Sequence, residues 1–228
     1  MIHIYQQAKK DLDTSEQHPV PRTLDEPGNR GRYSWQDDAF TFEVDLSDQP
    51  HDCLCLWLDD GVMFYANGYF QWGEQQPLID WNCSKEVIKD TAAEIYACIR
   101  REEYWRLEAL SGSFLLLFFD TQTKLTIVTD RLASRQIFHY QDKNVQVFAE
   151  NIQDILSLST VNQELDLRSV VEFLRFAMIL EHRTLYKEIT LIPPACVVTM
   201  GFGKAVFRRY WDWEYNESWS HSDEYYVD

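Results

Sequence analysis

Five cysteines carry the most reactive side chains of this sequence. A cysteine thiolate can attack a carbonyl carbon or bind a metal ion. The number is odd, no pair has C-x-x-C spacing, and a metal would need further ligands in a recognisable motif that is missing here. We therefore expect no metal site, and reduced thiols that pack in the core: Cys53, Cys55, Cys83, Cys98 and Cys196.

Three further residues could take part in acid–base or ionic chemistry. Asp130 and Arg131 are adjacent and oppositely charged, which we interpret as a buried or interface ion pair. His139 stands in an apolar strand-like block without an evident Ser or Cys partner. The sequence therefore predicts a packed, hydrogen-bonded histidine at this position.

Strands and two helices must position these residues. The helical pattern covers 85–110, ended by Gly112, and 167–179, with Asp166 as N-cap. The segment 14–32 has the Pro, Gly and charge content of a loop, and D-D-G at 59–61 indicates a hairpin. This arrangement predicts an α+β fold of stacked sheets with helices outside. Strands are expected at 3–7, 39–46, 53–58, 62–66, 114–120, 124–130, 136–140, 145–150, 196–200 and 205–211.

Composition excludes several classes of protein. The 228 residues include 13 Phe, 12 Tyr and 8 Trp but only 8 Gly, which is typical of much buried sheet. A net charge of −16 argues against duplex nucleic acid or an anionic membrane as partner. Since no apolar run has the length of a membrane span and the first residues lack a secretory signal, we expect a cytoplasmic location.

Several ordered blocks carry a family resemblance. They are G-S-F-L-L-L-F-F-D, D-R-L-A-S-R-Q-I-F-H-Y, F-A-E, P-P-A-C and R-Y-W-D, at 112–120, 130–140, 148–150, 193–196 and 209–212. This series resembles the N-terminal glutamine amidotransferase domain of asparagine synthetases. The resemblance implies the amidotransferase type 2 architecture, an αββα sandwich like that of N-terminal-nucleophile hydrolases. It would span residues 1–212, of which 1–35 are loop-rich, and leave 213–228 as an acidic aromatic linker.

The resemblance also implies which residues would form a glutaminase site. In the family an N-terminal cysteine attacks glutamine with its own α-amine as base, and an Asn-Gly turn holds the oxyanion. The matches for substrate binding are Asn67 and Gly68, and Asp90 for the substrate ammonium. From the residues alone, Asn67-Gly68 is more simply a hairpin turn and Asp90 a solvated carboxylate near a helix start.

Three departures predict that this glutaminase site is inactive. Met1, followed by Ile2, stands where the family has its cysteine, so we expect no catalytic residue in the chain. No arginine lies between Arg32 and Arg100 to bind the glutamine carboxylate, and the strand expected there carries Glu43 and Asp45 instead. Tyr69 replaces the glutamate that follows Asn-Gly. Milder departures, expected to affect backbone shape, are Ala133 and Ala195 for glycines and Gln136 for a proline.

Two functions of different class follow. The first is a degenerate, structural domain of an asparagine-synthetase-related enzyme that forms amide bonds. Its synthetase domain, with an S-G-G-x-D-S loop and the ATP and magnesium it implies, is absent from this chain. The second is a free-standing module that binds a small amino acid or amide. A third interpretation is an intact glutamine-hydrolysing asparagine synthase whose active parts lie outside this sequence.

The aromatic tail predicts an association surface. Trp211, Trp213, Tyr215 and Trp219 lie close together in a polar segment, which is typical of interface anchors. An alternative is that the first two simply finish the last strand. We expect the tail to contact the synthetase domain or a second copy, and the charge of −16 favours the synthetase domain.

Overall fold

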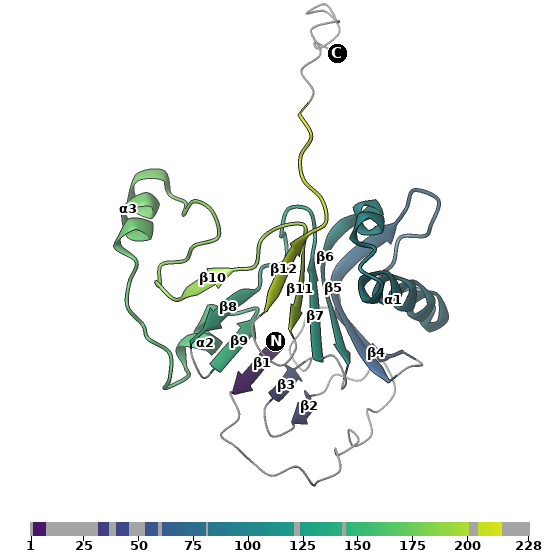
Figure 1. The fold of residues 1–228 in the computed structure, drawn as a ribbon, viewed down its shortest axis with the longest axis horizontal. Coiled ribbons are helices and arrows are strands. Elements are labelled where there is room, and N and C mark those ends of the chain that lie inside the picture. The colour runs from purple at the N-terminus through teal and green to yellow at the C-terminus, as the bar shows by residue number, and fades with distance from the viewer. Residues whose placement is uncertain are drawn as a thin grey trace, which may run out of the picture.

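The computed structural model describes residues 2–7, 32–36, 40–45, 53–58, 61–80, 82–120, 124–142, 145–200 and 205–215, the first three segments by their backbone alone. In these residues two six-stranded antiparallel sheets form (Figure 1). The first sheet has the order β10 (Ile189–Leu191), β8 (Phe138–Gln141), β9 (Val145–Ala149), β1 (Ile2–Gln7), β3 (Phe40–Asp45) and β2 (Arg32–Gln36). The second has the order β12 (Val206–Arg209), β11 (Cys196–Met200), β7 (Lys124–Thr129), β6 (Leu110–Asp120), β5 (Val62–Trp72) and β4 (Cys53–Trp57).

Alternation along β5 separates two cores. Phe64 and Ala66 belong to the core that lies under the first helix. Met63 and Tyr65 belong to a second core, which includes Phe148 from β9 of the other sheet. Because both faces of β5 and β6 are buried, their sequences are apolar almost throughout, as the sequence analysis expected. The observed architecture is α+β.

The helix α1 (Lys85–Arg100) covers one face of the second sheet. The predicted extension to residue 110 is wrong, because Glu102 adopts a left-handed conformation with φ 59°. The Glu103 N–H donates to the Cys98 carbonyl and the Glu102 N–H to the Ile99 carbonyl, which is the Schellman pattern of a helix end. A 3₁₀ helix, Tyr104–Ala109, follows. Gly112 lies inside β6 and ends no helix.

Two shorter helices follow β9. They are α2 (Ile152–Leu156) and α3 (Leu167–Phe176). The predicted N-cap is confirmed, since the Asp166 carboxylate accepts a hydrogen bond from the Arg168 N–H. The helix α3 ends three residues earlier than predicted, at the left-handed Ala177, and stands away from the sheets in Figure 1.

Most predicted strands are confirmed, with two differences around the site. The β4–β5 hairpin and the final β11–β12 hairpin form where they were expected. The strand β2 was not predicted, and most of the loop expected before it lies outside the described residues. Asn67 and Gly68 form no turn, because β5 continues through them to Trp72. No helix among the described residues is long and apolar enough to cross a membrane.

Candidate functional site

The Asn67–Gly68 pair lies in the middle of β5, with a strand on each side. Asn67 is opposite Cys53 of β4 and Leu115 of β6. Gly68 has φ +97°, and a Cβ built there would lie 2.1 Å from the Ser113 carbonyl oxygen. Only glycine therefore fits at this position, for a reason that requires no ligand.

The Asn67 side chain joins the two sheets. Its Nδ2 donates a hydrogen bond of 2.8 Å to Oε1 of Glu150, the residue that follows β9. The register pairs His3 with Ala149, so the start of β1 runs beside Glu150. Asn67 Oδ1 is buried, and no described residue donates a hydrogen bond to it. The end of β9 and the middle of β5 therefore meet at one amide, which we call the Asn67 site.

A thiol and a phenol border the Asn67 site. Tyr65 is fully buried, and its hydroxyl donates to Cys53 Sγ at 3.4 Å. Burial, and next the charge of Glu150, raise the pKa of Tyr65 well above its ordinary value. Sequence reasoning missed that Cys53 and Asn67 are neighbours, because the pairing depends on the register of β4 against β5.

The loop after β7 covers the Gly68 side of the site. Asp130 is 1% exposed and accepts hydrogen bonds from the backbone N–H groups of Phe114, Leu132 and Ser134, and from the Ser134 hydroxyl. The Ser134 hydroxyl lies 2.7 Å from that of Ser113 on β6. A buried carboxylate thus holds the loop against the central strands, as buried charges require.

The predicted ion pair between Asp130 and Arg131 is wrong. The Arg131 guanidinium instead donates to the Glu108 carbonyl at 2.6 Å and lies 4.9 Å from the centre of the Trp211 ring. Successive residues at this bend leave in different directions, so adjacent charges do not meet. Trp211 therefore packs on its own domain, beyond the end of β12, whereas Trp213 is 72% exposed.

Arg135 is the cation that approaches the Asn67 site. Its Nε lies 3.3 Å from the position that a Cβ on Gly68 would occupy. The family resemblance places its arginine upstream of Asn67, whereas this one lies downstream and was not predicted. The available signal was its place in the block 130–140, which belongs to the family pattern.

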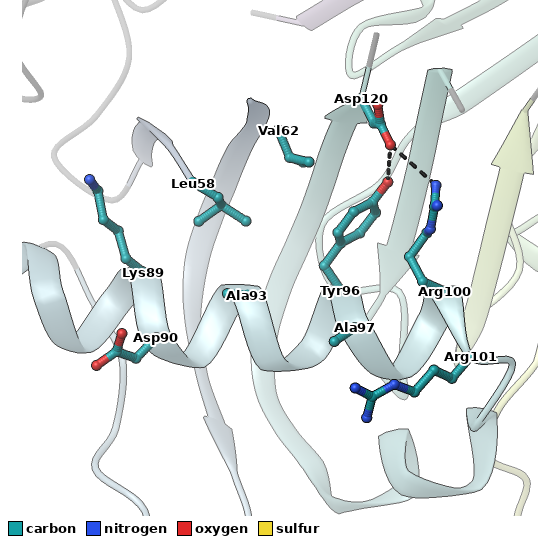
Figure 2. Close-up of a pocket in the computed structure, with 10 residues that line it drawn as sticks. All are labelled: Leu58, Val62, Lys89, Asp90, Ala93, Tyr96, Ala97, Arg100, Arg101 and Asp120. Atoms are coloured by element: carbon teal, nitrogen blue, oxygen red, sulfur yellow. Dashed lines mark hydrogen bonds and ion pairs between the residues drawn. The ribbon is translucent and has the colours of Figure 1, made fainter. Parts of the chain in front are cut away.

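Asp90 does not join the Asn67 site. It is exposed on α1, which packs on the face of the second sheet opposite to Asn67. Figure 2 shows it at the rim of a pocket of about 660 Å³ between α1 and the ends of β5 and β6. There the Tyr96 hydroxyl and the Arg100 guanidinium both donate to Asp120, at 2.9 and 3.3 Å. The pocket mixes basic and acidic groups and holds no residue of the Asn67 site.

The prediction for His139 is confirmed. It is 8% exposed, lies 2.9 Å from the Gln146 side chain and stacks on Phe148. Burial lowers the pKa of His139 to about 4, so the ring is neutral at pH 7. The ring serves packing and is not placed at the Asn67 site.

None of the five cysteines forms a disulfide, and two of them are fully buried. Cys98 and Cys196 are buried, while Cys53, Cys55 and Cys83 are partly buried. Burial raises the pKa of Cys55 to about 12 and that of Cys196 to about 11. Within the part of the chain that the structure describes, no three His, Cys, Asp or Glu residues gather as metal ligands would.

Two antiparallel sheets packed through apolar faces, with a helix on the outer face of the second sheet, define the class of protein as an α+β domain. The model of the glutamine amidotransferase domain family matches residues 90–211, slightly more than half of the chain. The chain belongs to this family. The matched segment begins at Asp90 and therefore excludes Asn67 and Gly68. No curated protein matches the sequence.

Proposed function

We propose that this chain is a degenerate glutamine amidotransferase domain with a structural role in an asparagine-synthetase-related enzyme. Its two stacked sheets and the helix α1 are compatible with an αββα sandwich of the N-terminal-nucleophile type. Family membership supports the amidotransferase ancestry. The asparagine-synthetase relationship rests on the ordered blocks from Gly112 to Asp212.

The observation that carries the loss of activity is the bond from Asn67 Nδ2 to Glu150. Attack on an amide creates an oxyanion, which preorganised N–H donors must stabilise. Here the amide donor that would match this role already binds a carboxylate at 2.8 Å. A negative charge at that distance repels an oxyanion, and displacing it breaks a charge-assisted hydrogen bond.

Burial and a nearby carboxylate oppose activation of the thiols near the site. A nucleophilic cysteine needs a lowered pKa or an adjacent base. Burial raises the pKa of Cys55 to about 12, which leaves it protonated. Cys53, opposite Asn67, accepts a hydrogen bond from the Tyr65 hydroxyl, and the charge of Glu150 acts on that same hydroxyl. We therefore expect neither thiol to attack glutamine.

A glutaminase assay tests the proposal. Ammonia release from glutamine is measured for the whole chain, for Cys53→Ser and for Cys83→Ser, whose thiol lies before α1 and away from Asn67. The expected result is background release for all three. Release by the wild type that disappears in Cys53→Ser but persists in Cys83→Ser would refute a structural role.

A second function is favoured by two polar groups at the Asn67 site. The buried Asn67 Oδ1 can accept a hydrogen bond, and the Arg135 guanidinium approaches Gly68. An amide N–H and a carboxylate are the matching groups of a ligand, so the second candidate is a module that binds a small amino acid or amide.

Calorimetry separates this candidate from the first. Glutamine and asparagine are titrated into the wild type and into Asn67→Leu, with Asp90→Asn as the control on the opposite face of the sheet. A binding heat that only Asn67→Leu abolishes supports the module. A flat titration at millimolar ligand removes it, while a reading frame that continues past residue 228 into S-G-G-x-D-S favours the structural domain.

A further inference from the structure

The pocket between α1 and the ends of β5 and β6 has the size of a small-molecule site. Its volume of about 660 Å³ lies within the roughly 300–1,000 Å³ of ligand pockets. It lies on the side of the second sheet that α1 covers, whereas Asn67 lies on the other side. No described residue of the Asn67 site lines it, so what it binds is independent of the proposed function. We call it the α1 pocket.

One side of α1 forms the floor of the α1 pocket. Four of its residues are spaced by four, four and three positions, which places them in one row along the helix. They are Lys89, Ala93, Ala97 and Arg100. Figure 2 shows Lys89 and Arg100 at the two ends of this row, with Ala93 between them, and an offset of eleven residues corresponds to about 16 Å along the axis. Since the two alanines have no side chain beyond Cβ, a slot remains between the two cations.

The wall opposite this row is apolar and fixed. It consists of Leu58 and Val62, at the turn between β4 and β5, and both side chains belong to the core under α1. The Leu58 N–H donates to the Val62 carbonyl at 2.9 Å, which joins the two residues across the turn. An apolar wall that faces a floor of alanines removes the apolar surface of a ligand from water. We therefore expect the middle part of a ligand to be apolar.

A held guanidinium stands at one end of the slot. The Tyr96 ring stacks on Phe118 with 5.1 Å between the ring centres, and its hydroxyl donates to Asp120 at 2.9 Å. Asp120 accepts a second bond, of 3.3 Å, from Arg100, so this carboxylate orients the guanidinium (Figure 2). A guanidinium has five N–H donors, and among the described residues only Asp120 accepts from the Arg100 side chain. The other donors are available to a second carboxylate, which a guanidinium binds through two parallel hydrogen bonds.

The charges around the α1 pocket favour an anion. Its lining has three basic and two acidic side chains, a net charge of +1, in a chain whose net charge is −16. Such a local reversal of sign attracts anions and repels cations. The acidic side chains oppose this only weakly, because Asp120 is paired with Arg100 and Figure 2 shows Asp90 on the side of the helix away from the apolar wall.

We propose that the α1 pocket binds a small organic carboxylate with an apolar body. The carboxylate accepts hydrogen bonds from Arg100, and the body lies on Ala93 and Ala97 against the apolar wall. Inorganic phosphate would meet the cation but leave the apolar wall uncovered, and a neutral hydrocarbon would leave the guanidinium without a second anion. The chemistry that fits both parts of the pocket is that of an aliphatic or aromatic acid.

Calorimetry of the whole chain with octanoate tests the site, with octanol and octylamine as neutral and cationic probes of the same chain length. For the wild type we expect octanoate to bind with a Kd below about 1 mM, octanol at least about 10-fold more weakly and octylamine not at all. Arg100→Gln should weaken octanoate binding at least about 10-fold, and Arg100→Lys less, since the charge remains. Ala93→Phe should abolish binding by filling the slot. The control Arg175→Gln, exposed on α3 and away from the pocket, should bind like the wild type.

Two further measurements keep the result decisive. Circular dichroism shows whether the variants fold, which is expected because Ala93 and Arg100 are exposed. Raising the salt concentration should weaken the binding of octanoate and leave that of octanol unchanged, since only the carboxylate contact is ionic. A flat titration at about 10 mM octanoate, octanol that binds as tightly as octanoate, or octanoate binding retained in both Arg100→Gln and Ala93→Phe overturns the proposal.

Discussion

Two alanines adopt a backbone conformation that favours glycine. Ala133 has φ 49° and Ala195 has φ 51°, and both stand where the family pattern has glycine. The left-handed region costs an L-residue about 1–2 kcal/mol. We predict that Ala133→Gly increases the free energy of unfolding, whereas the same change at Ala195 does not.

The size of each effect follows from burial. Replacing Ala133 by glycine removes the conformational cost of about 1–2 kcal/mol in the folded state. The greater freedom of the unfolded chain lowers stability by about 0.4–1 kcal/mol, so Ala133→Gly should raise the free energy of unfolding by roughly 0.5–1 kcal/mol. Ala195 is 2% exposed in the core under α1. Its methyl group contributes about 0.8 kcal/mol by burial, which brings the net effect of Ala195→Gly near zero.

Urea unfolding followed by circular dichroism measures both variants. The matched control is Ala93→Gly, an exposed position inside α1 with ordinary helical conformation, which should destabilise by about 1 kcal/mol. At about 2–4 °C per kcal/mol, Ala133→Gly should also raise the melting temperature slightly. A loss of stability in Ala133→Gly equal to that of Ala93→Gly would contradict the conformational argument.

Three other predictions concern the loop, the histidine and the tail. Asp130→Asn should destabilise by about 2–4 kcal/mol in urea unfolding, since an amide has one acceptor oxygen for several donors, and exposed Asp90→Asn should change little. The folded pKa of His139 is about 4, below its ordinary value, so the stability that the neutral ring contributes is present above about pH 6.5 and is lost as the pH falls toward 4. Over that range the free energy of unfolding of the wild type should fall by roughly 3 kcal/mol more than that of His139→Gln. Truncation after residue 211 should leave the melting temperature unchanged, and truncation after 210 should lower it, because the Trp211 ring covers Arg131.

The positions of most strands could be predicted from the sequence, but the helix end and the central turn could not. Glycine was taken to mark the end of a helix or strand. That assumption placed ends where the chain continues, and it missed ends at residues other than glycine. Gly68 and Gly112 lie inside the paired strands β5 and β6, where side chains do not fit. The chain turns instead at left-handed residues such as Glu102 and Ala177, which no propensity rule identifies. Tertiary contacts decided these positions.

The candidate site was predicted in part. Asn67 and Asp90 were grouped by resemblance, yet they lie on opposite faces of the second sheet. The alternation of side chains along β5 predicts part of this arrangement, since Asn67 shares its face with Tyr65 and not with Ala66. Which face α1 covers, however, depends on packing between segments far apart in the sequence, and so does the contact of Glu150 with Asn67.

The retained Asn-Gly pair has a structural explanation that requires no catalysis. At Gly68 the Ser113 carbonyl leaves no room for a Cβ, so any side chain would push β5 away from β6. At Asn67 the amide supplies a donor to the Glu150 carboxylate between the sheets, and removing it would leave that carboxylate without this bond. Both residues of the motif are therefore needed for the sheets to pack, whether or not glutamine is ever bound. Under the proposed function, the bond to Glu150 both explains the motif structurally and occupies the donor that the resemblance assigns to the oxyanion.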